Sequence, residues 1–159
     1  METTALYAGS FDPVTKGHEH IARRAAKLFG KLLIAVGDNS GKQPFFPLEQ
    51  RLAWLRETFR DVENIEVVSY QGLTVDACRR YGTNVLVRGL RSSADWEAES
   101  AVAFVNRKLA PDIETVLLPA EAAFAPFSST LVRELLRYGK EVSSMVPDAL
   151  RAEDFARFL

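Results

Sequence analysis

The sequence predicts an α/β fold, a Rossmann-like open sheet of five parallel strands with helices on both faces. Two observations predict it. Short runs of strand length alternate along the chain with longer helical patterns, an order typical of parallel sheets. The short runs are almost continuously apolar, as expected of strands that are covered on both faces. With 159 residues, of which 47% are hydrophobic, the chain suits one core, so we expect a single domain over residues 1–159.

Each expected strand is a run of aliphatic and β-branched residues bounded by polar or glycine-containing segments. The runs are residues 5–8, 32–36, 65–68, 85–87 and 115–118. The helical patterns between and after them cover about 17–29, 47–59, 73–81, 93–109 and 128–138, with a helical tail over about 147–159. Pro47 suits a first helical turn, and Gly82 and Gly139 suit helix ends. Trp54 and Phe104 fall on the predicted core-facing sides of their helices.

Composition excludes several classes of protein. Lys and Arg number 20 against 21 Asp and Glu, which argues against a generally basic nucleic-acid coat protein. The one cysteine can form neither an internal disulfide nor a cysteine-rich zinc site. The first residues lack the basic start and apolar run of a signal peptide, and no apolar stretch is long enough to span a membrane. We therefore expect a cytoplasmic protein with neither nucleic acid nor a membrane as partner.

In open parallel sheets, ligands bind at the carboxyl ends of the strands. The loops expected there are 9–17, 37–46, 88–93 and 120–129. In the first, Gly9 allows a close backbone approach and Ser10 offers a hydroxyl. Gly17 and His18 stand at a helix start, where amides and the helix dipole favour anions. The alternative is an ordinary loop with a surface histidine.

Neither a dinucleotide fingerprint nor a Walker A loop is present. After Gly9 the next glycine is Gly17, which breaks the Gly-x-Gly-x-x-Gly spacing. The segment from Gly37 to Gln43 has too few residues between its glycines, and Gln43 replaces the Ser or Thr that would hold magnesium. Lys42 is either an anion ligand or a solvated loop lysine.

His18 and His20 do not predict a metal site. Residues two apart on a helix point to nearly opposite sides, so the two imidazoles cannot share an ion. We expect no metal ligands in the protein and a surface position for His20.

The third and fourth loops also carry anion-binding groups. Arg88 and Arg91 flank Gly89 directly after an apolar strand, where two guanidinium groups indicate either a bound anion or pairing with Asp95 or Glu99. The hydroxyl run 128–130 suits either helix capping or a phosphate site.

These residues resemble the signatures of a known superfamily. Thr15-Lys16-Gly17-His18 resembles the (H/T)-x-G-H signature of the nucleotidylyltransferases, and Phe127-Ser128-Ser129-Thr130 with Arg133 resembles their second signature, I-S-S-T-x-x-R. Narrower matches are Gly-Ser-Phe-Asp-Pro at 9–13, Pro-Leu-Glu-Gln-Arg at 47–51, Arg-Gly-Leu-Arg at 88–91, Asp-Trp-Glu at 95–97 and Asn-Arg at 106–107. Together they are similar to the bacterial phosphopantetheine adenylyltransferases.

The resemblance implies an activity: ATP and 4′-phosphopantetheine give dephospho-coenzyme A and pyrophosphate, the penultimate step of coenzyme A synthesis. It implies direct in-line attack, Mg²⁺ carried with ATP, a homohexamer, and feedback inhibition by coenzyme A. Two alternatives stay open. One is a sister nucleotidylyltransferase acting on nicotinamide mononucleotide or an alcohol phosphate, and the other is a non-catalytic nucleotide-binding regulator.

The resemblance also implies residue roles. His18, Lys42 and Arg91 are the expected catalytic residues. The expected ATP site contains Ser10, Phe11, His18, Gly89, Leu90, Arg91, Glu99, Phe124, Ala125, Pro126, Phe127, Ser128, Ser129 and Thr130. The expected phosphopantetheine site contains Ser10, Lys42, Thr74, Arg88 and Asn106. The chain departs from the family's commoner residues at Gly72, Ala98 and the run 124–127, where Pro126 stiffens the loop and removes an amide donor.

Overall fold

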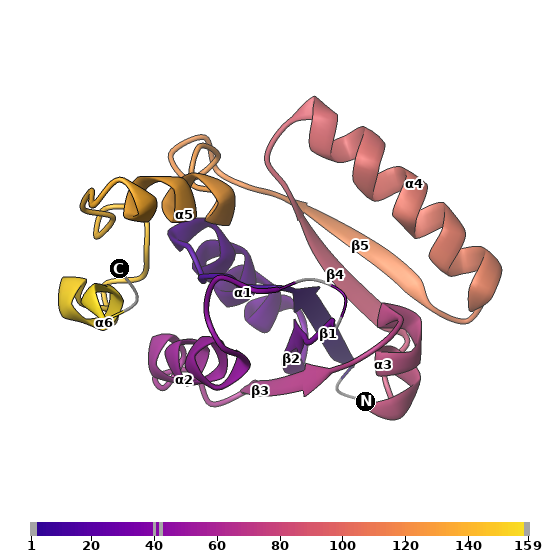
Figure 1. The fold of residues 1–159 in the computed structure, drawn as a ribbon. Helices are drawn as coiled ribbons and strands as arrows, with labels where there is room; N and C mark the ends of the chain where they lie inside the picture. Colours follow the sequence, from indigo (N-terminus) through magenta and orange to yellow (C-terminus); the bar gives the residue numbers. More distant parts are fainter. Residues whose placement is uncertain (1–2, 40, 42, 158–159) are drawn as a thin grey trace.

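The computed structural model describes residues 3–39, 41 and 43–157, and it has one sheet of five parallel strands (Figure 1). The strands are β1 (Thr4–Gly9), β2 (Lys31–Gly37), β3 (Ile65–Tyr70), β4 (Val85–Leu90) and β5 (Glu114–Pro119). Their order in the sheet is β3-β2-β1-β4-β5. The predicted Rossmann-like sheet is confirmed, with strands two or three residues longer than the apolar runs indicate.

Helices cover both faces of this sheet. They are α1 (Lys16–Leu28), α2 (Leu48–Thr58), α3 (Thr74–Arg80), α4 (Ser93–Leu109), α5 (Ser129–Arg137) and α6 (Ala152–Ala156). Successive residues of a strand point to opposite faces. Ala5 and Tyr7 of β1 therefore join the core beneath α1, α2 and α5, while Leu6 and Ala8 join the core beneath α3. No helix within the described ranges is long and apolar enough to cross a membrane.

The direction in which the chain adds strands to the sheet reverses between β1 and β4. From β1 the chain adds β2 and β3 on one side, then returns and adds β4 and β5 on the other. β1 pairs with β2 over six residues but with β4 only at Leu6–Leu86 and Tyr7–Val87. Beyond those pairs the two strands separate. A crevice at the carboxyl ends of β1 and β4 is the ligand site expected of such a topology.

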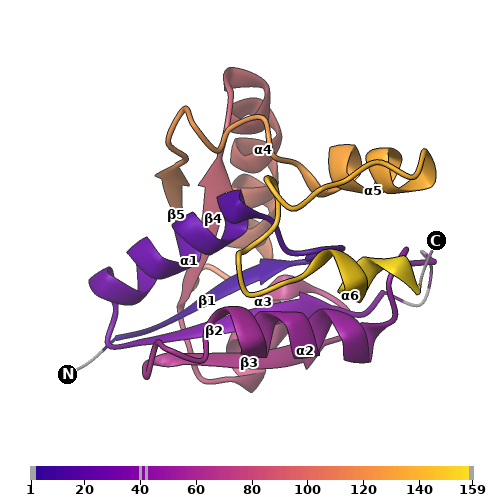
Figure 2. The same ribbon diagram turned by 90° about the vertical axis from the view of Figure 1, so that its left-hand side faces the viewer.

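The C-terminal tail is mostly not helical, contrary to the prediction over about 147–159. Residues 147–151 run through turns rather than a helix, although Leu150 is buried as an amphipathic helix would require. Only α6 is helical, and Figure 2 shows it lying alongside α2. Phe155 of α6 packs on Trp54 of α2, with ring centroids 4.8 Å apart, and residues 158–159 lie outside the described part.

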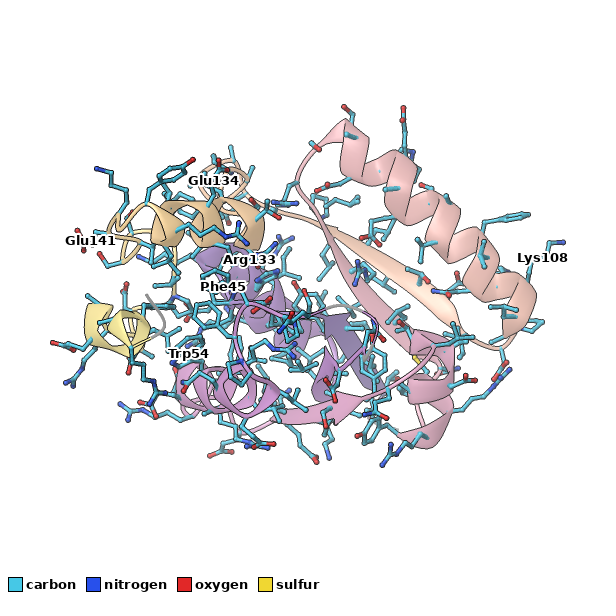
Figure 3. The ribbon with its side chains drawn as sticks, in the orientation of Figure 1. Phe45, Trp54, Lys108, Arg133, Glu134 and Glu141 are labelled. Carbon is cyan, nitrogen blue, oxygen red and sulfur yellow. The ribbon has the colours of Figure 1, made fainter. Side chains whose placement is uncertain are left out.

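Helix α4 has the predicted bounds but a different environment. Trp54 is buried, as predicted, whereas the prediction of a core position for Phe104 is wrong because 64% of Phe104 is exposed. None of the residues of α4, all of them described, is buried, although the helix runs beside β4 and β5 (Figure 1). Figure 3 shows Lys108 pointing outward from its far end. Sequence periodicity indicates an apolar face but not what covers it.

Candidate active site

A cleft of about 300 Å³ opens at the carboxyl ends of β1 and β4. Most of the predicted site residues line it: Ser10, Phe11, His18, Arg88, Gly89, Arg91, Glu99, Phe127, Ser128, Ser129 and Thr130. Three of the four predicted strand-end loops therefore meet around one space. The lining also includes Tyr7, which the sequence did not single out, and Thr15, Asp95 and Arg133, which belong to the quoted signatures and matches but were given no role of their own in the site.

The first loop is held in a tight conformation. Phe11 has φ +46°, a left-handed backbone that few residues other than glycine adopt, and its side chain is buried edge-on between Tyr7 and His18. The carboxylate of Asp12 accepts hydrogen bonds from the amides of Phe45 and Phe46, both at 2.8 Å. The first loop is thereby fastened to the loop after β2.

His18 is fixed by a capping box at the start of α1. The backbone N–H of Thr15 donates to Nδ1 of His18 at 3.0 Å, and the Thr15 hydroxyl accepts from the His18 amide at 3.3 Å. Because Nδ1 accepts, a neutral His18 carries its proton on Nε2. Nε2 has no hydrogen-bond partner among the described residues, so it is available to donate into the cleft.

The surroundings of His18 keep it neutral. Burial, and then the positive charges of Arg91 and Arg88, lower the pKa of His18 to about 4. At neutral pH the imidazole is therefore an uncharged hydrogen-bond donor held at a helix N-terminus, where the dipole also favours an anion.

Arg88 is anchored within the gap between β1 and β4. Its Nε and Nη2 donate to the two carboxylate oxygens of Glu99 at 2.9 and 2.7 Å, and its Nη1 donates to the carbonyl of Ala8 at 2.6 Å. Burial alone would lower the pKa of Arg88, but the bonds and charge of Glu99 outweigh it and raise the pKa. The sequence left two alternatives for Arg88, a bound anion or a pair with an acid, and in the structure it forms the pair, with Glu99.

Arg91 lies at the mouth of the same cleft. Its backbone N–H donates to Asp95 at 2.8 Å, and its Nε lies 3.3 Å from the same carboxylate oxygen. The side chain is 41% exposed, so this pair can rearrange at low free-energy cost. Arg91 can thus reach an anion that enters from solvent.

The start of α5 forms the third wall. The Ser128 hydroxyl caps the helix by accepting from the Leu131 amide at 3.1 Å. Ser129 donates to the carbonyl of Pro13 at 2.8 Å, and Arg133 donates to the carbonyl of Asp12 at 2.7 Å. The helix start therefore faces the cleft in a fixed position relative to the first loop.

Arg51 is a supporting residue whose role sequence reasoning missed. It is 2% exposed and donates to three carbonyls: Phe46 at 3.0 Å, Ser10 at 2.8 Å and Gly37 at 3.2 Å. Burial lowers its pKa, against the charges of Asp12 and Asp38. The available signal was an arginine on the apolar side of helix α2.

A second cleft of about 570 Å³ adjoins the first and shares Ser10 and Arg133 with it. It lies between α5 and the loop after β2, the region where Figure 3 labels Arg133 and Phe45. Arg137 stands over the Phe45 ring, 5.3 Å from its centroid. Lys42, predicted as a catalytic and substrate residue of this loop, lies outside the described residues.

Several predicted site residues do not line the first cleft. They are Leu90, Phe124, Ala125, Pro126, Thr74 and Asn106. Thr74 begins α3, and its hydroxyl lies 3.2 Å from that of Tyr70 at the end of β3. Asn106 lies on α4. Gly72, two residues before Thr74, has φ +83°, a left-handed backbone that glycine adopts without steric cost.

His20 is not the surface residue that was expected. Only 19% of its side chain is exposed, and Nε2 lies 3.0 Å from the carboxylate of Glu121. It points away from His18, as the helical spacing predicted. Within the described ranges, no group of three or more His, Cys, Asp or Glu side chains is placed to hold a metal ion.

Comparison with known proteins identifies the class first. Residues 6–135 match the model of the Cytidylyltransferase-like family. Two solved structures share the fold at 16% identity. One, a bifunctional NMN adenylyltransferase/ADP ribose pyrophosphatase from Francisella tularensis, has a TM-score of 0.70 and covers 92% of this chain and 45% of that one. The other, from Vibrio parahaemolyticus, has a TM-score of 0.68 and covers 99% of both chains.

Curated relatives narrow the class. Proteins named phosphopantetheine adenylyltransferase include one from Flavobacterium psychrophilum, 43% identical over 94% of this chain and 98% of that protein. Others come from Methylococcus capsulatus, 40% identical over 99% and 98%, and Synechococcus sp., 46% identical over 97% and 93%. The chain belongs to the phosphopantetheine adenylyltransferase family.

Proposed function

We propose that this chain transfers the adenylyl group of ATP to 4′-phosphopantetheine, giving dephospho-coenzyme A and pyrophosphate. The observation that carries the proposal is the convergence of a neutral histidine donor, two arginines and two helix starts on one cleft. Such a cleft suits two phosphorylated molecules held against each other. It contains donors and cations for developing negative charge, which is what phosphoryl-type transfer requires.

The proposed step is a single in-line displacement. An oxygen of the phosphopantetheine phosphate forms a bond to the α-phosphorus of ATP, and the bond from that phosphorus to the β-phosphate bridging oxygen breaks. The electron pair leaves with pyrophosphate. A phosphate monoester is already largely a dianion at neutral pH, so the attacking oxygen needs no general base.

His18 fits the role of donor rather than base. Its proton is on Nε2, because Nδ1 accepts from Thr15, and its lowered pKa keeps it neutral. We propose that Nε2–H donates to a non-bridging oxygen of the α-phosphate, where charge increases in the transition state. A preformed donor costs no reorganisation at that moment.

The arginines fit the two ends of the reacting phosphates. Arg88 uses three of the five N–H groups of a guanidinium on Glu99 and Ala8, which leaves two for the phosphate of phosphopantetheine. Arg91 would leave Asp95 for the β- and γ-phosphates, with the start of α5 beside them. Lys42 would bridge the attacking phosphate and ATP, and Glu99 would act chiefly by orienting Arg88.

Mg²⁺ would enter with ATP. The acids of the cleft, Asp95 and Glu99, are engaged with arginines, so phosphate oxygens and water are the natural ligands of the ion. Bound there, it would neutralise the leaving pyrophosphate. The residues of this chain would bind the magnesium complex through its phosphates.

We also propose that the chain assembles as a homohexamer and that coenzyme A inhibits it. The support for assembly is α4, whose exposed side chains include Trp96, Val102, Phe104, Val105 and Leu109. Several large apolar side chains exposed on one helix support an interface there.

The test is pyrophosphate release from the purified chain with ATP, Mg²⁺ and 4′-phosphopantetheine. Parallel reactions contain nicotinamide mononucleotide, or glycerol 3-phosphate with CTP. Release that requires phosphopantetheine is the expected result. Release only with another acceptor would assign a sister activity, and ATP binding without release from any acceptor would favour a regulator.

A further inference from the structure

The face of α1 opposite His18 holds the segment that follows β5. Gly17, His20 and Arg24 are separated by three and four residues, so they lie on one side of the helix. Arg24 donates to the carbonyl of Pro119, the last residue of β5, at 2.6 Å. A Cβ at Gly17 would lie 3.5 Å from the carbonyl oxygen of Phe124. The helix therefore touches this segment at its beginning and near its end.

His20 supplies the central contact. Its Nε2 lies 3.0 Å from Oε1 of Glu121, and its ring lies 4.9 Å from that of Phe124 at an interplanar angle of 34°. Because a carboxylate only accepts, Nε2 must carry a proton in this contact. The other ring nitrogen is buried without a hydrogen-bond partner within the described ranges. His20 is thus committed to the segment by both its ring face and its N–H.

The segment itself leads directly into the cleft. Three turn bonds shape it: Phe124 N–H to Glu121, Ala125 N–H to Glu121, and Phe127 N–H to Phe124. Ala120 and Phe127 line the cleft, and α5 begins two residues after Phe127. A displacement at Glu121 or Phe124 would therefore move the wall of the cleft beside the nucleotide.

We propose that His20 is a positioning residue: through Glu121 and Phe124 it sets the place of segment 120–127, and hence of the nucleotide base, relative to His18. The inference rests on the function proposed above and on the expected ATP site, which includes residues 124–127, and it places the adenine of ATP against this segment. One helix then fixes both ends of the adenylyl group, with the α-phosphate at His18 and the segment that holds the base at His20 and Arg24, two and six residues further along.

The pair contributes to nucleotide affinity and not to the chemical step. Glu121 is 64% exposed, and partly exposed pairs of this kind have modest effects. We expect His20→Ala, which removes ring contact and hydrogen bond together, to weaken ATP binding about fivefold. Glu121→Ala should weaken it about threefold, and kcat should stay within about twofold in both, because neither side chain touches the reacting phosphates.

The experiment is titration calorimetry of the full-length chain with ATP and, separately, with 4′-phosphopantetheine. The variants are His20→Ala, Glu121→Ala, the double variant, and Glu121→Gln, whose amide oxygen still accepts from Nε2. Lys27→Ala, an exposed position in the last turn of α1, seven residues beyond His20, is the matched control. Unfolding midpoints equal to that of the unaltered chain would show that the variants are not destabilised.

The expected result is weaker ATP binding in both single variants, no further loss in the double variant, near-normal binding in Glu121→Gln and Lys27→Ala, and unchanged phosphopantetheine binding. Unchanged ATP affinity in His20→Ala, or an equal loss for both ligands, would overturn the inference. Calorimetry measures binding and needs no turnover, so it tests the inference separately from the reaction. If the variants lose ATP affinity selectively but the unaltered chain releases no pyrophosphate, the inference is supported and the proposed reaction is rejected. Absence of ATP binding by the unaltered chain would reject both.

Discussion

Replacing His18 by alanine removes one donor from the proposed transition state, together with the acceptor of the Thr15 amide and the ring contact with Phe11. The side chain has a single available N–H, at Nε2, and it is uncharged because burial and the nearby arginines hold its pKa at about 4. Loss of one preorganised donor of this kind costs about 2.7–4 kcal/mol of transition-state stabilisation. We therefore expect kcat to fall by a factor of about 10² to 10³, with both KM values changed by no more than about threefold.

The assay is steady-state pyrophosphate release, with ATP and 4′-phosphopantetheine each varied up to saturation, for the wild type, His18→Ala and the control Lys27→Ala. It is repeated from about pH 6 to pH 8.5. A neutral donor with a pKa of about 4 keeps its protonation state over that range. The ratio of wild-type to His18→Ala kcat should therefore be constant with pH.

Two results would refute the reasoning about His18. A defect confined to KM would mean that the side chain binds ground state and transition state equally. A kcat ratio that falls as the pH is lowered through about 6.5 would mean that His18 acts as a base with an ordinary histidine pKa.

Three further predictions concern stability and assembly. His18 should make the free energy of unfolding depend on pH, because the unfolded chain binds a proton at His18 below about pH 6.5 while the folded chain does so only near pH 4. In urea unfolding, the contribution of His18 to the free energy of unfolding should be constant above about pH 6.5 and lower by about 3 kcal/mol at pH 4. An identical loss in His18→Gln would contradict this. Arg51→Met should destabilise the fold by at least about 3 kcal/mol, because three carbonyls lose a buried donor; an unchanged urea midpoint would disprove the role given to Arg51. Phe104→Glu should reduce the mass measured by light scattering from a hexamer to a smaller species, because a charge replaces an exposed apolar side chain of the proposed interface; an unchanged hexamer would place the interface elsewhere.

The sheet and the position of its site were predictable because both depend on local patterns. Apolar runs alternating with helical periods indicate a parallel sheet, and such a sheet places its ligands at the strand ends. That rule singled out the loops carrying Ser10, Arg88 and Ser128, and the structure brings these three residues to one cleft.

The contacts that fasten those loops depend on residues far apart in the chain. Arg51 reaches Ser10 across 41 positions, and His20 reaches Glu121 across 101. Neither pairing leaves a periodic signal. Phe104 shows the converse limit: the periodicity of its helix predicted a core position, but the side chain is 64% exposed, because periodicity does not indicate what covers an apolar face.

The most direct test of the account is the stereochemical course at the α-phosphorus. The chain would be supplied with 4′-phosphopantetheine and one diastereomer of adenosine 5′-O-(1-thiotriphosphate), and the configuration of the dephospho-coenzyme A analogue would be determined by phosphorus NMR. A single in-line displacement, with His18 and the arginines stabilising charge, predicts inversion. Retention would require a covalent adenylyl-enzyme intermediate and would contradict the mechanism, and absence of the product, with unmodified ATP also inactive, would contradict the proposed function.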